Sequence, residues 1–136
     1  MYDRRSVLQG STVILTGGLA GCCFNRDVPS EGQVAWVSLT NDSKNQHEVR
    51  VTISNEGVTN FFETYQLGTS MDSAKAYVED PVSGFGKYHV QATISDQSAS
   101  VYIPKWVDGD EQCVGVDFLI GTDGTLYWDT KSMQEC

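Results

Sequence analysis

Positive charge is scarce in this sequence. The 136 residues contain 9 Lys and Arg against 18 Asp and Glu, which gives a formal net charge of −9 at pH 7. Proteins bind nucleic acids mainly by neutralising phosphates with Lys and Arg side chains. A chain this acidic is therefore expected not to bind DNA or RNA.

A hydrophobic run long enough for a transmembrane helix is also missing near the amino terminus. The uncharged stretch from Gly10 to Gly21 has about twelve residues, whereas a helix that spans the hydrocarbon core needs about 20. This stretch follows two arginines, Arg4 and Arg5, and ends in small residues. A positive segment, a short apolar segment and a small-residue cleavage site together predict an export signal.

Two short motifs make this interpretation more specific. Residues 3–9, Asp-Arg-Arg-Ser-Val-Leu-Gln, resemble the twin-arginine motif of Tat export signals, with Val7 where Phe is commoner and Gln9 where Lys is commoner. Residues 19–22, Leu-Ala-Gly-Cys, resemble a lipobox. In a lipobox a lipid is attached to the cysteine, here Cys22, and the signal peptide is cleaved just before that cysteine. Together the motifs resemble the leaders of lipoproteins from halophilic archaea.

This resemblance implies the following domain organisation and location. Residues 1–21 form a Tat-type lipoprotein signal peptide, residues 22–33 a lipidated tether, and residues 34–136 the folded domain. The mature protein is expected on the extracellular side of the cell membrane, held there by the lipid on Cys22. Cys23 either accompanies the anchor or pairs between chains. The scattered carboxylates then suit a protein surface in concentrated brine.

No segment shows a convincing helical period, and the rest of the chain alternates with the period of two that is typical of strands. One segment, Ser70 to Val78, is ambiguous between an edge strand and a turn of helix. The eight candidate strands lie within 34–39, 49–53, 60–67, 70–78, 88–94, 99–103, 114–120 and 126–130. Eight strands over residues 34–131, about one every 12 residues, predict a β-sandwich.

A further motif indicates which type of β-sandwich the chain forms. Gly86-Lys87-Tyr88-His89-Val90 resembles the Gly-x-Tyr-x-Cys stretch of immunoglobulin-like domains, with Val90 in the place of Cys. The resemblance implies an Ig-like antiparallel β-sandwich of about 7–8 strands. It also implies that Tyr88 is a tyrosine-corner residue, with its ring in the core and its hydroxyl bonded to nearby backbone.

Cysteine is present four times but never at two-residue spacing, which argues against a thioredoxin-type site or a zinc cluster. With Cys22 taken by lipid in an exported protein, Cys113 and Cys136 are the expected disulfide. In the chain-entropy model, closing this loop stabilises the fold by about 3 kcal/mol.

Catalytic and metal chemistry find little support. His47, His89, Cys113 and Met133 supply the ligand types of a blue-copper site, but no His or Met follows Cys113 closely, as cupredoxins require. The acidic segment Asp108 to Glu111 lacks the EF-hand pattern and is expected to be a solvated turn. No Gly-x-Ser-x-Gly motif occurs. We therefore expect no enzyme, no catalytic residue, no metal and no cofactor.

Three tryptophans remain as candidates for binding: Trp36, Trp106 and Trp128. Trp106 precedes the acidic segment and is the candidate binding residue, whereas Trp128, in phase with Leu126, is expected in the core. The sequence thus predicts a noncatalytic interaction or accessory module, attached to the membrane by lipid, with a protein partner at the cell surface. The alternative is an anchored protein that binds a small ligand (sugar, peptide or cation). A cupredoxin-like redox protein is a third class.

Overall fold

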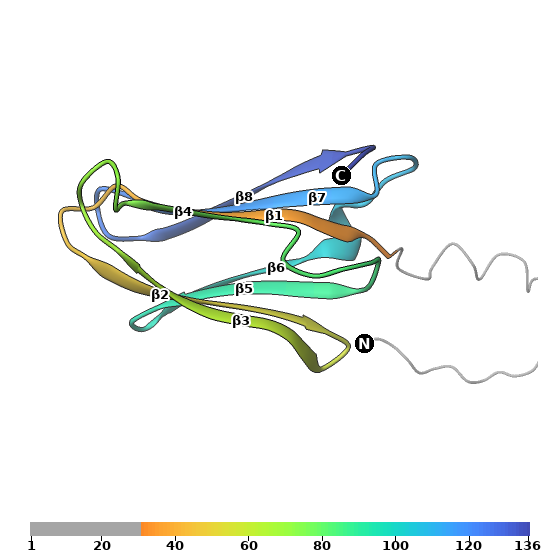
Figure 1. Ribbon diagram of the computed structural model, residues 1–136, viewed down its shortest axis with the longest axis horizontal. Coiled ribbons are helices and arrows are strands. Elements are labelled where there is room, and N and C mark those ends of the chain that lie inside the picture. The colour runs from red at the N-terminus through yellow and green to blue at the C-terminus, as the bar shows by residue number, and fades with distance from the viewer. Residues whose placement is uncertain (1–30) are drawn as a thin grey trace, which may run out of the picture.

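The computed structural model describes residues 31–136, which form two four-stranded sheets packed face to face (Figure 1). All eight predicted strands are present, so the predicted all-β sandwich is confirmed. The elements are β1 (Gln33–Asn41), β2 (His47–Asn55), β3 (Val58–Leu67), β4 (Lys75–Glu79), β5 (Tyr88–Ile94), β6 (Gln97–Tyr102), the 3-10 helix η3 (Ile103–Trp106), β7 (Cys113–Ile120) and β8 (Leu126–Met133). Within residues 31–136, no helix is long and apolar enough to cross a membrane.

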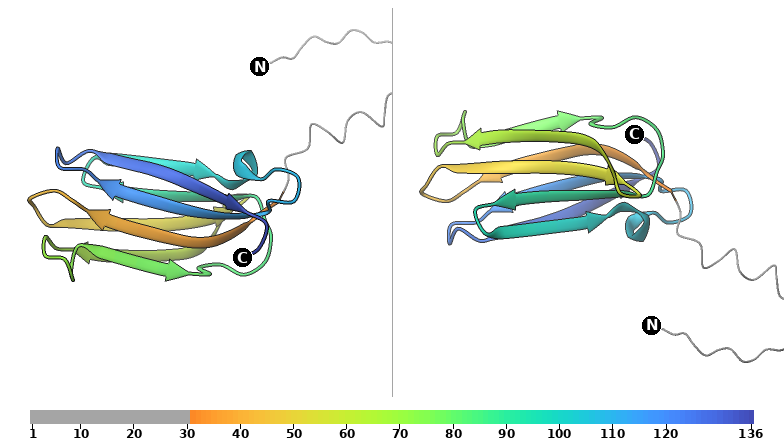
Figure 2. Two further views of the ribbon diagram at one scale, coloured as in Figure 1. Left: turned by 90° about the horizontal axis from the view of Figure 1, so that it is seen from above. Right: turned by 90° about the horizontal axis from the view of Figure 1, so that it is seen from below.

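The strands are divided between the sheets in a fixed order. One sheet has the order β4-β1-β7-β8 and the other the order β3-β2-β5-β6, and Figure 2 shows the two sheets from opposite sides. The pairs are antiparallel with the exception of β1 and β7, which run parallel. This parallel pair is an addition to the predicted antiparallel arrangement. The ambiguous segment contains the edge strand β4, preceded by a turn.

The core is built mainly by the central strands β1, β7, β2 and β5. Every second residue of β1, β7, β2 and β5 points inward, and its apolar side chain is removed from water on both sides of the interface. A bulge near the start of β1 turns both Val34 and Ala35 inward. The edge strands contribute less: within the described residues β6 supplies the buried Ala99 and Val101, β3 supplies Leu67, and β4 and β8 supply no buried residue. Burial of the central strands therefore holds the two sheets together.

The strand order corresponds in large part to an immunoglobulin fold. The sheet β3-β2-β5-β6 matches strands C′-C-F-G, and the neighbours β1 and β4 match strands B and E. Strand A would pair with B in an immunoglobulin domain, but here β7 takes that side of β1 and runs parallel to it. The two carboxyl-terminal strands thus complete the second sheet.

Tyr88 forms the predicted tyrosine corner at the start of β5. Its ring is buried, and its hydroxyl donates to the carbonyl oxygens of Ser83 at 3.0 Å and Gly84 at 3.2 Å. Burial, with a smaller contribution from the charge of Glu31, raises the pKa of Tyr88 above its ordinary value. The hydroxyl therefore keeps its proton and remains a donor at neutral pH. The corner fixes the connection from β4 into β5.

Replacing Tyr88 with Phe is expected to destabilise the fold by about 1 kcal/mol, because the ring stays in place while two carbonyl groups lose their donor. Urea unfolding monitored by circular dichroism measures this difference. The matched control is Tyr102→Phe, since the ring of Tyr102 stacks on His89 at the surface, 4.4 Å between centroids. The control should change stability by less than about 0.5 kcal/mol. Equal stability of wild type and Tyr88→Phe would contradict the role of the corner.

The core prediction for Trp128 is wrong. Trp128 has the inward phase of Leu126 and lies opposite the buried Phe118, as its alternation predicts. However, β8 is the last strand of its sheet, so the large ring extends beyond the facing sheet and is 43% exposed. Alternation gives the face of a side chain, whereas its burial also depends on whether another strand covers it.

Candidate functional site

The two ends of the described chain meet at one narrow end of the sandwich (Figure 1). Gly32 pairs with Gly86 through two backbone hydrogen bonds of 3.0 and 2.9 Å, and Gln33 is the first residue of β1. The sandwich thus begins at the last residues of the predicted tether. The predicted signal residues Arg4, Arg5, Leu19, Ala20 and Gly21, together with the predicted lipid site Cys22, lie outside the described residues.

Cys113 and Cys136 lie at disulfide distance at this same end, as predicted. Their Cα atoms are 5.5 Å apart, and the structure joins the two sulfur atoms. Cys113 is the buried first residue of β7, while Cys136 follows the end of β8. The bond therefore ties the carboxyl-terminal segment to a central strand of the sheet.

Trp106, the predicted binding residue, is the last residue of η3. It lies on the open side of the sandwich, where the edge strands β6 and β8 of the two sheets face each other. Its ring packs edge-on against Trp128, 5.7 Å between centroids at an interplanar angle of 74°. The Ser132 hydroxyl donates to the Trp106 carbonyl oxygen at 2.6 Å. Trp106 thus joins η3 to the edge strand β8, and with 36% of its surface exposed it acts chiefly as a cover for this side.

The candidate copper ligands are not brought together. His47 begins β2, whereas His89 is the second residue of the neighbouring strand β5 and pairs with Ser54 near the other end of β2. The ring of His89 stacks on Tyr102. Met133 is the register partner of Cys113. The sulfur of Cys113 is in a disulfide, and a disulfide sulfur is not the thiolate that a blue-copper site uses. Residues 31–136 contain no group of three His, Cys, Asp or Glu side chains close enough to hold a metal ion.

The acidic segment Asp108 to Glu111 forms a tight exposed turn. Asp108 and Glu111 exchange backbone hydrogen bonds of 3.2 and 2.8 Å, and Gly109 takes a positive φ of 55° between them. The side chains of the segment are exposed to solvent. The turn is thus held by its backbone and directs its carboxylates outward.

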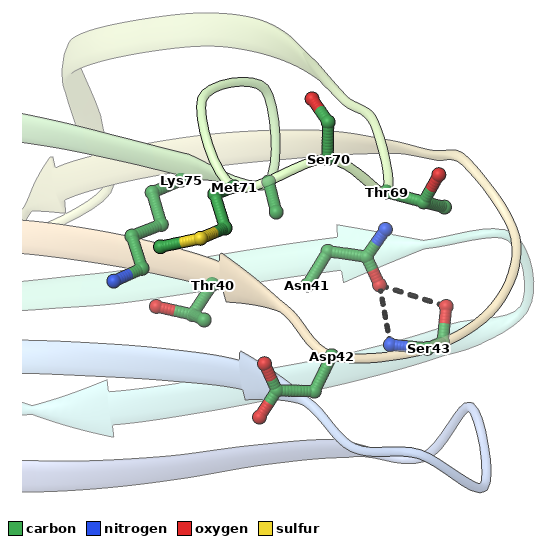
Figure 3. Close-up of a pocket in the computed structure, with 9 residues that line it drawn as sticks. Thr40, Asn41, Asp42, Ser43, Thr69, Ser70, Met71 and Lys75 are labelled. Carbon is green, nitrogen blue, oxygen red and sulfur yellow. Dashed lines mark hydrogen bonds between the residues drawn. The ribbon is translucent and has the colours of Figure 1, made fainter.

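A cavity of about 350 Å³ lies at the opposite end of the sandwich, between the end of β1 and the β3–β4 connection (Figure 3). Its most buried polar side chain is Asn41, whose Oδ1 accepts from the backbone N–H and the hydroxyl of Ser43 at 3.0 and 2.7 Å. Its Nδ2 donates to the carbonyl oxygens of Asn45 and Gly68 at 2.8 and 2.9 Å. Asn41 therefore uses its amide to join three segments of the chain, which is a structural role.

The outer face of the β4-β1-β7-β8 sheet carries a second aromatic pair. Trp36, half-buried on β1, lies beside Tyr77 of β4, 6.3 Å between ring centroids, and Tyr77 is 60% exposed. Asp117 of β7 accepts a hydrogen bond from the Trp36 indole at 3.0 Å. The sequence singled out Trp36 as aromatic but missed Tyr77 and Asp117, because their proximity depends on pairings of β1 with distant strands.

Comparisons of the chain with protein families, with curated proteins and with solved structures found no match.

Proposed function

We propose that this chain is a noncatalytic, lipid-anchored interaction or accessory module on the outer side of the cell membrane, with Cys22 as the anchored residue. The observation that carries the proposal is the position of Gly32, which is already hydrogen-bonded into the narrow end of the sandwich. It lies ten positions after Cys22 in the sequence. At no more than about 3.6 Å per residue, this connection reaches at most about 36 Å. The lipid would therefore hold that end of the domain close to the membrane.

The charges at this end provide no attraction to an anionic bilayer in addition to the lipid. The turns around the start of β1 carry more carboxylates than ammonium groups: Glu31, Glu56, Asp80, Asp108, Asp110, Glu111 and Glu135 against Lys87 and Lys105. Carboxylates repel anionic lipid headgroups, and salt at molar concentration screens this repulsion within about 3 Å. In concentrated brine these carboxylates therefore neither attract the domain to the headgroups nor repel it beyond contact, and the lipid alone would hold the domain at the membrane.

The alternative is an anchored protein that binds a small ligand, and one observation favours it. Trp36 and Tyr77 form an aromatic surface on the outer face of the β1 sheet, where an apolar ring is not needed for the core. Exposed aromatic groups that lie together on a sheet favour binding of another molecule. In this alternative the anchor has the same role, and the ligand is held at a sheet face.

Replacing Cys22 with Ser tests the anchor. Because the hydroxyl cannot form the thioether, the variant of the full chain is expected in the medium of an exporting haloarchaeal host. The amount in the membrane fraction should fall at least about tenfold, since a two-chain lipid holds a protein stably at a bilayer. Intact-mass spectrometry of the wild-type membrane fraction should give residues 22–136 plus the lipid.

The matched control is Cys23→Ser, which changes the adjacent thiol and should leave the protein in the membrane fraction. A Cys22→Ser variant that stays with the membrane would contradict the proposal. A wild-type mass that corresponds to the unprocessed 136-residue chain would contradict it too.

A further inference from the structure

The Trp36 ring is held flat against the sheet. Gly115 of β7 lies beneath it, and a Cβ added at Gly115 would overlap three atoms of the indole. A side chain at this position would therefore push the ring away from the sheet. Glycine in a strand interior weakens the strand, and it is expected where another group approaches the backbone closely. With one ring face on Gly115, the opposite face of the indole points away from the sheet.

Two hydrogen bonds fix the orientation of this ring. The indole Nε1 donates to Asp117 Oδ1 at 3.0 Å, and the Ser38 hydroxyl donates to the same oxygen. Neither bond uses Asp117 Oδ2. Asp129 is the register partner of Asp117 on β8, so a second carboxylate lies on the same face. The ring is thus preorganised beside oxygen atoms that remain able to accept hydrogen bonds.

Tyr77 extends the aromatic surface across the neighbouring strand. Its ring is tilted by 31° relative to that of Trp36, and it is 60% exposed on the edge strand β4. No described strand or helix covers this outer face of the sheet (Figure 2). The two rings therefore form a shallow open strip, which we call the Trp36–Tyr77 surface.

We propose that the Trp36–Tyr77 surface binds an uncharged polysaccharide made of pyranose sugars. One face of a pyranose ring presents C–H groups, which pack on an aromatic ring, while its hydroxyl groups project from the rim. Asp117 Oδ2 and Asp129 lie where such hydroxyl groups can donate to them. An open strip accepts a polymer that extends beyond it in both directions, whereas a single small ligand favours an enclosed pocket.

The charges on this face select against acidic polymers. Asp117 and Asp129 lie on the β8 side of Trp36, and Glu79 is its register partner on β4. Two basic side chains share this face: Lys131 is the register partner of Gly115, and Lys75, two residues before Tyr77 on β4, is the register partner of Thr40. A uronate-rich or sulfated polysaccharide would meet repulsion from three carboxylates against attraction to two lysines, and the net charge of −9 for the whole chain adds to the repulsion. A neutral polymer meets no such barrier.

This inference deepens the ligand-binding alternative and does not depend on the lipid anchor. Its residues lie in β1, β4, β7 and β8, within the described sandwich. Loss of membrane attachment in the Cys22→Ser variant would leave this surface unchanged. The two experiments can therefore fail separately.

Affinity electrophoresis tests the binding proposal. The full chain with Cys22→Ser is run through native gels that contain one neutral polysaccharide each: a β-glucan, a mannan, a xylan or a galactan. Retardation by at least one of these polymers is expected. Tyr77→Ala and Trp36→Ala should each weaken that binding about tenfold or more, which corresponds to the loss of one aromatic stacking contact.

Two controls keep the result interpretable. Trp106→Ala removes a partly exposed tryptophan on the open side of the sandwich and should leave retardation unchanged. Tyr77→Ala changes an exposed residue of an edge strand, so it reports on binding even if Trp36→Ala perturbs the sheet. Circular dichroism of each variant confirms that the strands are retained.

Three outcomes would overturn the proposal. The first is that none of the neutral polymers retards the chain. The second is binding that survives both Tyr77→Ala and Trp36→Ala. The third is retardation by polygalacturonate or by a lysine-rich peptide alone, because these probes would indicate a site selected by charge.

Discussion

A Phe118→Ala variant is expected to lose about 3–5 kcal/mol of unfolding free energy, the largest effect of any single substitution considered. Phe118 is 2% exposed and lies on the inner face of β7, in the centre of the core. Removal of the ring forfeits its burial and leaves a cavity that the close-packed sheets can fill only in part. The free energy of unfolding of a small domain is about 5–15 kcal/mol in total, so the variant should be close to unfolding at room temperature.

Leu119→Ala is the matched control, because Leu119 is the next residue of the same strand and faces outward opposite Tyr127. Removal of the Leu119 side chain should lower the free energy of unfolding by less than about 1 kcal/mol. Urea denaturation of both variants provides the comparison. Similar losses for Phe118→Ala and Leu119→Ala would mean that the inward and outward faces of β7 are assigned incorrectly.

The Cys136→Ser variant should be the second most destabilised, by about 3 kcal/mol in the chain-entropy model. Its partner Cys113 is 23 positions away in the sequence, and the disulfide restricts the unfolded chain over that loop. The segment after β8 should also become accessible to carboxypeptidase, since its last residue no longer holds it to β7. Denaturation in oxidising buffer and a timed carboxypeptidase digest measure the two effects.

A reducing agent is the control for this variant. Treatment of the wild type should lower its stability to that of Cys136→Ser, whereas the same treatment should leave the variant unchanged. If the wild type and Cys136→Ser unfold at the same denaturant concentration in oxidising buffer, Cys113 and Cys136 are not bonded in solution.

Most of the fold could be predicted because it is encoded locally. Alternation of apolar and polar residues over five to ten positions located the strands. The resemblance of residues 86–90 to the Gly-x-Tyr-x-Cys stretch of immunoglobulin-like domains located the corner at Tyr88. The parallel pairing of β1 with β7 could not be predicted in this way. It joins residues about 80 positions apart, and the strand sequences alone leave the choice of neighbours open.

The Trp36–Tyr77 surface was missed for the same reason, although one residue carried a signal. Gly115 lies in the interior of β7, at an outward position of its alternation, and a strand glycine marks a position where another group approaches the backbone. That signal does not tell which group approaches. Trp36 is far from Gly115 in the chain and reaches it only because β1 lies beside β7. Trp106, by contrast, was selected for its local context and covers the side of the sandwich.

The position of Trp36 near the start of β1 has a mechanical consequence. If the anchor holds the chain before Gln33 while a bound polymer is pulled at Trp36, as proposed, both forces act on this one strand, three positions apart. The tension then passes along the covalent backbone from Gln33 to Trp36, and the remainder of the two sheets carries little of it. Under both proposals, a pull on the polymer would therefore reach the anchor without unfolding the sandwich.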